Sequence, residues 1–296
     1  MPWTHLLRRA PRLTAEQGLD TWYASLLTPL GGKPQPFDLA LHGGRCAATP
    51  GLAFLAGYQA ALRVLWPAAP WSVGALCATE QRSTRVADMS TRIDGLHISG
   101  RKDFVTAAEC VDWLLVAARD EAAGEAPRLV LGVVRQGAPG VRIEPLPALP
   151  LMPDIGHACL HLSQAQVERL AGDGWSDYVK PFRTIEDVHV LTAVGAWLYG
   201  IGDECGWPEA LQLRLLALLS GCAEVARLSP HEAATHLLLA GLFATQQALT
   251  KELDAAFAAG PAHWAALWQR DRGLLQIAAA ARGKRLEKAR QIVAQG

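Results

Sequence analysis

Residues 79–106 read T-E-Q-R-S-T-R-V-A-D-M-S-T-R-I-D-G-L-H-I-S-G-R-K-D-F-V-T. In this stretch, short alternations of apolar and polar residues, such as Leu96-His97-Ile98, lie between residues that favour turns. Asp94-Gly95 accepts the positive φ of a tight hairpin, and Ser99-Gly100 is a second turn signal. The stretch therefore predicts a β-hairpin in a small antiparallel sheet, and helix across residues 93–105 would contradict it.

The chain around this hairpin divides into three segments. Residues 1–71 read as helix and loop: the capping box Thr14-Ala-Glu-Gln17 opens one helix, Thr49-Pro50 opens another, and the prolines between them predict a loop. Residues 72–164 carry short Val- and Leu-rich runs that predict a small β-barrel or orthogonal sheet. Residues 165–296 read as helices, one of which starts at the capping box Thr184-Ile-Glu-Asp187.

Composition and charge exclude several classes of function. The 296 residues have a formal net charge of zero, so nothing indicates binding to nucleic acid or to an anionic membrane surface. Half of the residues are hydrophobic and 19% are charged, which favours extensive burial. The basic tail around Arg282, Lys284 and Arg285 is interpreted as a solvated helix face. Six scattered cysteines fit a reducing, cytoplasmic compartment, and the apolar runs are too short to span a bilayer.

Candidate metal ligands have unfavourable spacing. His231 and His236 are five residues apart, which puts them roughly 140° apart around a helix, and Glu232 suits a first helical turn. His157, Cys159 and His161 share one face of a strand, where histidines without further ligands usually serve as hydrogen-bonding residues. We expect no metal site, and the sequence has no serine-hydrolase, P-loop or Rossmann motif.

The sequence of the hairpin resembles that of the middle domain of the acyl-CoA dehydrogenases. The counterparts of the family motifs are Thr79-Glu80, Ser99-Gly100-Arg101-Lys102 and Phe104-Val105-Thr106, and residues 138–147 read A-P-G-V-R-I-E-P-L-P, close to another family motif. The resemblance implies an α+β fold with an N-terminal helical part (1–71), a middle antiparallel β-barrel domain (72–164) and a C-terminal helical bundle (165–296). It also implies an FAD site that includes Thr79, Phe104, Val105 and Thr106. The family's glycine-rich loop is replaced by residues 81–86, Q-R-S-T-R-V.

Glu186 is the candidate catalytic residue. As a plain structural residue it would be an early-turn acid behind a Thr184 cap, favoured by the helix dipole. It also begins an apolar helical face that continues through Val190 and Trp197, and partial desolvation there would raise its pKa toward that of a useful base. The resemblance implies that a minority of the family's members carry their catalytic Glu on this helix, and Ala279 stands at the position that holds the Glu in most members. Asp187 is a weaker choice.

Two functions stay open at the level of sequence. One is an acyl-CoA dehydrogenase-like flavoprotein in which Glu186 removes the α-proton of an acyl thioester while FAD accepts a β-hydride. The other is a non-catalytic relative that binds an acyl group, a carrier or a protein partner. The resemblance further implies a homo-oligomer, which the low charge content also favours, and an electron-transfer partner.

Overall fold

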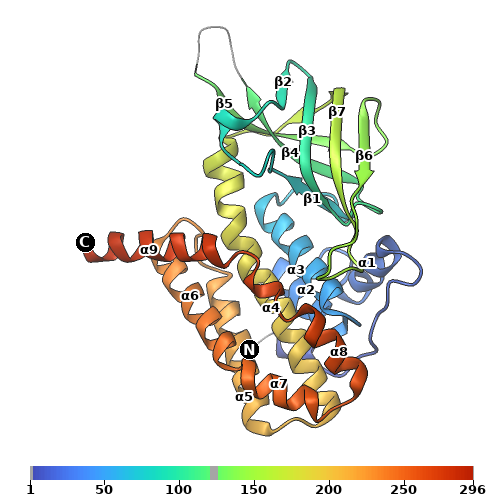
Figure 1. The fold of residues 1–296 in the computed structure, drawn as a ribbon, viewed down its shortest axis with the longest axis vertical. Coiled ribbons are helices and arrows are strands. Elements are labelled where there is room, and N and C mark those ends of the chain that lie inside the picture. The colour runs from blue at the N-terminus through green and yellow to red at the C-terminus, as the bar shows by residue number, and fades with distance from the viewer. Residues whose placement is uncertain (1–2, 121–125, 296) are drawn as a thin grey trace.

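The computed structural model describes residues 3–120 and 126–295, in which helices precede and follow a β-sheet (Figure 1). The α-helices are α1 Leu19–Leu27, α2 Pro36–Cys46, α3 Pro50–Leu65, α4 Lys180–Cys205, α5 Glu209–Val225, α6 Ala233–Ala248, α7 Thr250–Ala258, α8 Ala262–Asp271 and α9 Ala279–Gln295. The strands are β1 Gly74–Cys77, β2 Arg92–Asp94, β3 His97–Thr106, β4 Trp113–Asp120, β5 Arg128–Arg135, β6 Val141–Pro145, β7 His157–Gln166 and β8 Glu168–Arg169. The order of elements agrees with the predicted α+β class, while the division into three domains stays an interpretation.

The strands form one curled sheet in the order β6-β7-β3-β2-β4-β5-β8, with β1 paired to β4. Most pairs are antiparallel, as predicted, but β1 runs parallel to β4, and β2 meets β4 in a single parallel pair. The curl encloses an apolar cluster that includes Ile98, Val105 and Leu160. No pairing joins β6 to β8 within the described ranges, so the predicted barrel is an open one there.

The predicted hairpin is confirmed. β2 pairs antiparallel with β3, and Asp94 is the partner of His97, so the two-residue loop is Gly95-Leu96, one residue later than predicted. Gly95 adopts a φ of 57°, a conformation that costs glycine little. β3 continues to Thr106 and pairs with β7. The predicted residues Phe104, Val105 and Thr106 therefore lie at the end of β3.

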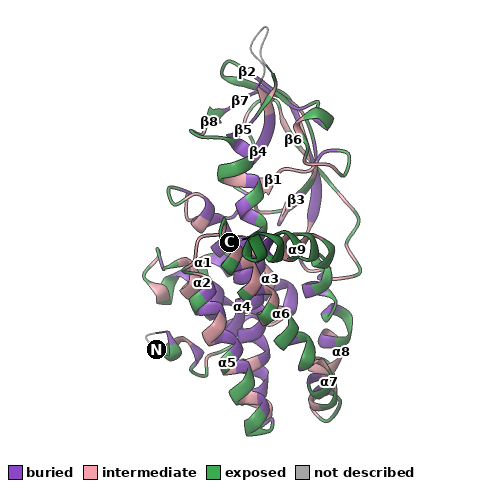
Figure 2. Cartoon of the chain, turned by 90° about the vertical axis from the view of Figure 1, so that its left-hand side faces the viewer, coloured by how far each residue is buried: buried purple, intermediate pink, exposed green. Residues whose placement is uncertain are grey.

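Helix α4 is the central element of the helical part, and most of its residues are buried (Figure 2). It packs against α2, α3 and α5. Close approach depends on glycine: a Cβ at Gly44 of α2 would lie 2.0 Å from the carbonyl oxygen of Ala193, and one at Gly57 of α3 would lie 2.7 Å from that of His189. Within the described ranges, every helix is too short or too polar to cross a lipid bilayer.

The helix boundaries test the capping signals. Thr49 caps α3 as predicted, since its hydroxyl accepts a hydrogen bond from the Leu52 N–H at 3.1 Å. The Thr14 capping box is wrong, because α1 starts at Leu19 after Gly18. Helix α2 was missed, because Pro36 opens a helix where a loop was predicted; proline suits a first helical turn.

The capping box at Thr184 is also wrong. α4 begins at Lys180, directly after the π-helical turn Gly174–Val179 (η4), and Pro181 lies in its first turn. The Thr184 hydroxyl is buried and has no hydrogen-bond partner among the described residues. Glu186 therefore lies in the second turn of α4, where the helix dipole contributes little.

The loop after Thr79 forms a tight turn without glycine. Glu80 and Ser83 exchange two backbone hydrogen bonds of 2.9 and 2.8 Å. Gln81 and Arg82 between them have φ values of 49° and 62°. A turn with positive φ at both central positions favours Asn-Gly. Both residues thus adopt left-handed backbone at the cost of strain, and Arg82 does so where the family has a glycine.

We therefore expect Arg82→Gly to raise the free energy of unfolding by about 1 kcal/mol, because it relieves the strain at positive φ. The backbone N–H of residue 82, which donates to Asp103 Oδ2 at 2.9 Å, is retained. Arg85→Gly is the matched control: Arg85 is also exposed but has a φ of −78°, so glycine there should destabilise by about 0.5–1 kcal/mol. Urea denaturation measures both, and equal effects of the two variants would contradict the assignment of strain.

Candidate active site

A cavity of about 230 Å³ lies between the sheet and the helices. The sheet side contributes residues of β1, the following loop and β3, and the helical side contributes residues of α3, η4, α4, the start of α9 and the residue before it. The full lining is Tyr58, Leu76, Ala78, Thr79, Phe104, Thr106, Val179, Phe182, Arg183, Glu186, Ala278, Ala281 and Arg285. Glu186 and three of the four predicted cofactor-binding residues thus meet at one cavity.

The sheet side of the cavity offers an aromatic ring and two hydroxyl groups. Phe104 is 47% exposed although it is a large apolar residue in a strand. Thr79 and Thr106 are half-buried beside it, and the Thr79 hydroxyl makes no hydrogen bond to another described residue. Val105 differs from the other predicted residues, because its side chain is fully buried in the apolar cluster inside the curled sheet. Val105 does not line the cavity, so the structure does not bring it together with the other three.

Glu186 is the carboxyl group of the helical side. It is partly accessible at the cavity, and the protein around it keeps most water away. Desolvation by burial, and secondarily the neighbouring Asp187, raise the pKa of Glu186 to about 7, against the opposing effect of Arg183 and Arg285. A carboxyl group with a pKa near neutrality can accept a proton from a weak carbon acid and release it again.

Asp187 holds α9 against α4 and is not free for chemistry. It is buried, and Arg282 donates a hydrogen bond of 2.9 Å to its Oδ1, while Arg285 contacts its Oδ2. Arg282 also stacks on Phe243 of α6, with its guanidinium carbon 3.8 Å from the ring centre. The interpretation of the basic tail as a solvated face is therefore wrong for these two arginines.

Tyr58 and Arg183 are among the cavity residues that sequence reasoning missed. Tyr58 is buried, its hydroxyl accepts a hydrogen bond from the Leu76 N–H at 2.8 Å, and it packs edge-on against Phe182. Burial raises the pKa of Tyr58, so its hydroxyl stays protonated, and it hydrogen-bonds with the side chain of Thr106 on the sheet side of the cavity. Arg183 is exposed at the cavity and makes no hydrogen bond or salt bridge within the described ranges. Tyr58 could have been found from the sequence, because it is a polar-tipped residue at an apolar position of α3.

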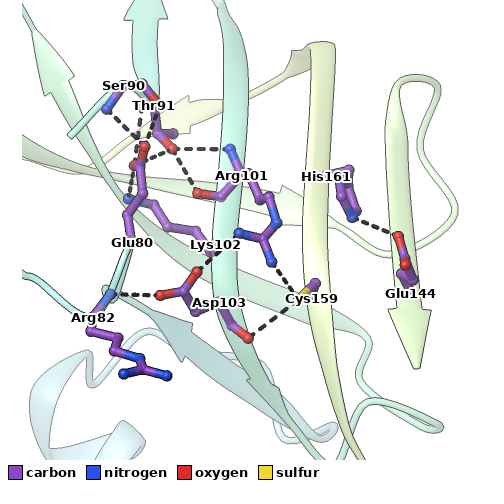
Figure 3. A network of polar contacts seen from close by, with 10 residues as sticks. All are labelled: Glu80, Arg82, Ser90, Thr91, Arg101, Lys102, Asp103, Glu144, Cys159 and His161. Atoms are coloured by element: carbon purple, nitrogen blue, oxygen red, sulfur yellow. Dashed lines mark hydrogen bonds and ion pairs between the residues drawn. The ribbon is translucent and has the colours of Figure 1, made fainter. Parts of the chain in front are cut away.

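A buried polar network fixes the loop that carries Thr79 (Figure 3). The backbone N–H groups of Ser90 and Thr91 donate to Glu80 at 2.8 and 3.2 Å, and Lys102 Nζ lies 3.1 Å from Glu80 Oε2. Burial alone would raise the pKa of Glu80, but the Ser90 and Thr91 hydrogen bonds and Lys102 outweigh it and lower the pKa to about 2. The Thr79 backbone oxygen is in turn bound by the Asp103 N–H at 2.9 Å.

The candidate metal ligands are engaged in other contacts or lie apart. Arg101 donates to Cys159 Sγ at 3.1 Å, and His161 Nε2 lies 2.9 Å from Glu144 (Figure 3). His231 lies before the start of α6, whereas His236 is on the helix. Within the described ranges no group of three or more His, Cys, Asp or Glu residues could hold a metal ion.

The architecture is shared with known flavoproteins. No protein-family model and no curated protein sequence matches the chain. Among solved structures, butyryl-CoA dehydrogenase from Megasphaera elsdenii aligns with a TM-score of 0.62 and 12% identity over 86% of this chain and 80% of that one. The fold is that of the acyl-CoA dehydrogenases. The identity is low, so the likeness establishes the fold and leaves the reaction open.

Two further solved structures with the acyl-CoA dehydrogenase fold match nearly the whole chain. FkbI, described for biosynthesis of the methoxymalonyl extender unit of Fk520, aligns with a TM-score of 0.60 and 21% identity over 99% of this chain and 97% of that one. PigA, solved with FAD and proline, aligns with a TM-score of 0.66 and 13% identity over 96% and 91%.

Proposed function

We propose that the protein is a flavin-dependent oxidoreductase that oxidises an acyl thioester. The observation that carries the proposal is the single cavity that brings Glu186, with its pKa raised to about 7, opposite Thr79, Phe104 and Thr106 of the sheet. Butyryl-CoA dehydrogenase and the FAD complex of PigA, which share the fold, make an acyl thioester and FAD the reactants to test first.

The residues on the sheet side fit a flavin ring. An exposed aromatic side chain near the end of β3, Phe104, provides a flat apolar surface for stacking. The Thr79 hydroxyl, which lacks a protein partner in the described residues, and Thr106 can hydrogen-bond to the polar edge of such a ring. When bound, FAD would supply the acceptor for the hydride from the β-carbon.

The helical side supplies the proton chemistry. In its carboxylate form Glu186 accepts the α-proton of the thioester, and the proton remains on that carboxyl group until solvent removes it. Val179 and Phe182 beside it exclude water from the reacting carbon. Asp187 keeps α9, and with it Arg285, in place at the cavity wall.

The second candidate is a non-catalytic relative that binds an acyl group, a carrier or a protein partner. The loop after Glu80 favours it, because Arg82 and Thr84 stand where the family has glycines that let the backbone approach flavin. A homo-oligomer and an electron-transfer partner stay predictions. Exposed apolar side chains on α5, α6 and α9, namely Leu213, Leu238, Ile292 and Val293, support the first of these.

FAD binding tests the proposal. Purified protein mixed with excess FAD and then gel-filtered should retain close to one FAD per chain, measured by visible absorption. Phe104→Ala should weaken FAD affinity by roughly tenfold, because the stacking surface is lost. Leu96→Ala, which removes another exposed apolar side chain from the same hairpin, is the control and should leave affinity unchanged. Wild-type protein that retains no FAD would favour the non-catalytic relative.

A further inference from the structure

The helical wall of the cavity carries two arginines beside the candidate base. Arg183 lies three residues before Glu186 on α4, so the two share a helical face, and Arg285 reaches the cavity from α9. A site for an uncharged acyl chain needs no such groups, and apolar residues would line it more favourably. The two guanidinium groups therefore require an explanation beyond oxidation of a plain acyl thioester.

The local charges do not balance. Arg282 and Arg285 share one carboxylate, that of Asp187. Arg183 makes no hydrogen bond or salt bridge to any residue that the structure describes, Glu186 included. Glu186 offsets this excess only in part, because burial raises its pKa to about 7. The cavity wall thus has a surplus positive charge that an anion would compensate.

The position of these arginines indicates which part of the ligand is anionic. Thr79, Phe104 and Thr106, which fit a flavin ring, lie on the sheet side, whereas Arg183 and Arg285 lie on the helical side with Glu186. The acyl group must approach Glu186 for its α-proton to be removed.

We propose that the substrate is an acyl thioester whose acyl group bears an anionic group, a carboxylate, recognised by Arg183 and Arg285. This inference rests on the proposed function and specifies its substrate class. The planar guanidinium fork of Arg183 matches a carboxylate in a way that a lysine would not. Arg285, held by Asp187, adds a fixed positive charge at the same wall.

The test compares two thioesters that differ only at the acyl end. Succinyl-CoA and butyryl-CoA have the same chain length and the same carrier, but succinyl-CoA ends in a carboxylate and butyryl-CoA in a methyl group. Calorimetric titration of the protein in excess FAD should show that succinyl-CoA binds about tenfold more tightly. Arg183→Met should abolish this preference and change the affinity for butyryl-CoA by less than about twofold, whereas Arg183→Lys should keep part of the preference.

The control is Lys288→Met, which removes one positive charge from an exposed position of α9 outside the cavity and should keep the full preference. Equal affinity of wild-type protein for the two thioesters would overturn the inference. So would an equal loss for both in Arg183→Met, since Arg183 would then contact the phosphates of the carrier. A retained succinyl preference without flavin reduction by either thioester would instead reject the proposed oxidation and leave the carboxylate site standing.

Discussion

Glu186→Gln is expected to lower the rate of flavin reduction by an acyl thioester about 10²- to 10⁴-fold, the usual cost of removing a general base. The amide has nearly the same shape as the carboxyl group, so the cavity and any bound FAD should be retained. Stopped-flow absorption under anaerobic conditions measures the rate. Glu287→Gln makes the same chemical change at an exposed position of α9 and should have no effect. Equal rates in wild type and Glu186→Gln would remove Glu186 as the base.

The raised pKa of Glu186 gives two further tests of the same residue. The base must be deprotonated, so the rate of flavin reduction in the free enzyme should rise with pH through about 7. The folded-state pKa of Glu186 is higher than its unfolded value of about 4.5. Ionisation of Glu186 therefore destabilises the folded protein increasingly as the pH rises above about 4.5. Glu186→Gln should therefore be more stable than wild type at pH 8, by at most about 3 kcal/mol, and the difference should disappear below pH ~4.5.

Glu80→Gln is expected to destabilise the protein by about 3–5 kcal/mol, because it leaves Lys102 charged and unpaired in a fully buried position. The matched control is Glu144→Gln. Its ion pair with Arg142 has a similar separation of 2.8 Å, but both side chains are more than half exposed, so the expected cost is much smaller than that of Glu80→Gln. Urea denaturation compares the two, and similar costs would show that burial does not govern the effect.

The depressed pKa of Glu80 predicts a characteristic acid sensitivity. The stabilisation from its ionised form is complete above the unfolded pKa of about 4.5 and is lost as pH falls toward the folded pKa of about 2. Adding Lys102→Met to Glu80→Gln should recover part of the lost stability, because no unpaired charge remains in the interior. No recovery in the double variant would indicate that the hydrogen bonds to Ser90 and Thr91 account for most of the cost.

Local signals predicted the parts of the fold that local physics decides. Gly95 supplies the positive φ of the hairpin, and Thr49 followed by proline caps α3, and both depend only on neighbouring residues. The signals at Thr14 and Thr184 failed for the same reason. A capping residue is favourable only where a helix starts, and the start of α4 is set by the π-helical turn before it and by burial along its length.

The candidate site was predicted only in part. The apolar face of the helix indicated Glu186, and the motif Phe104-Val105-Thr106 indicated the sheet residues. The register of β3, however, turns the Val105 side chain into the interior of the sheet. Arg282 and Arg285 could not be placed, because the sequence does not show that α9 returns across α4. Contacts between residues 95 or more positions apart, such as Asp187 with Arg282, depend on the tertiary fold.

Anaerobic titration of the FAD-loaded protein with succinyl-CoA and butyryl-CoA tests the central claim most directly. The account predicts that the visible absorption of oxidised flavin is lost with succinyl-CoA at a lower concentration than with butyryl-CoA, and that Glu186→Gln prevents the loss on the same time scale. Stoichiometric FAD whose absorption is unchanged by either thioester would contradict it.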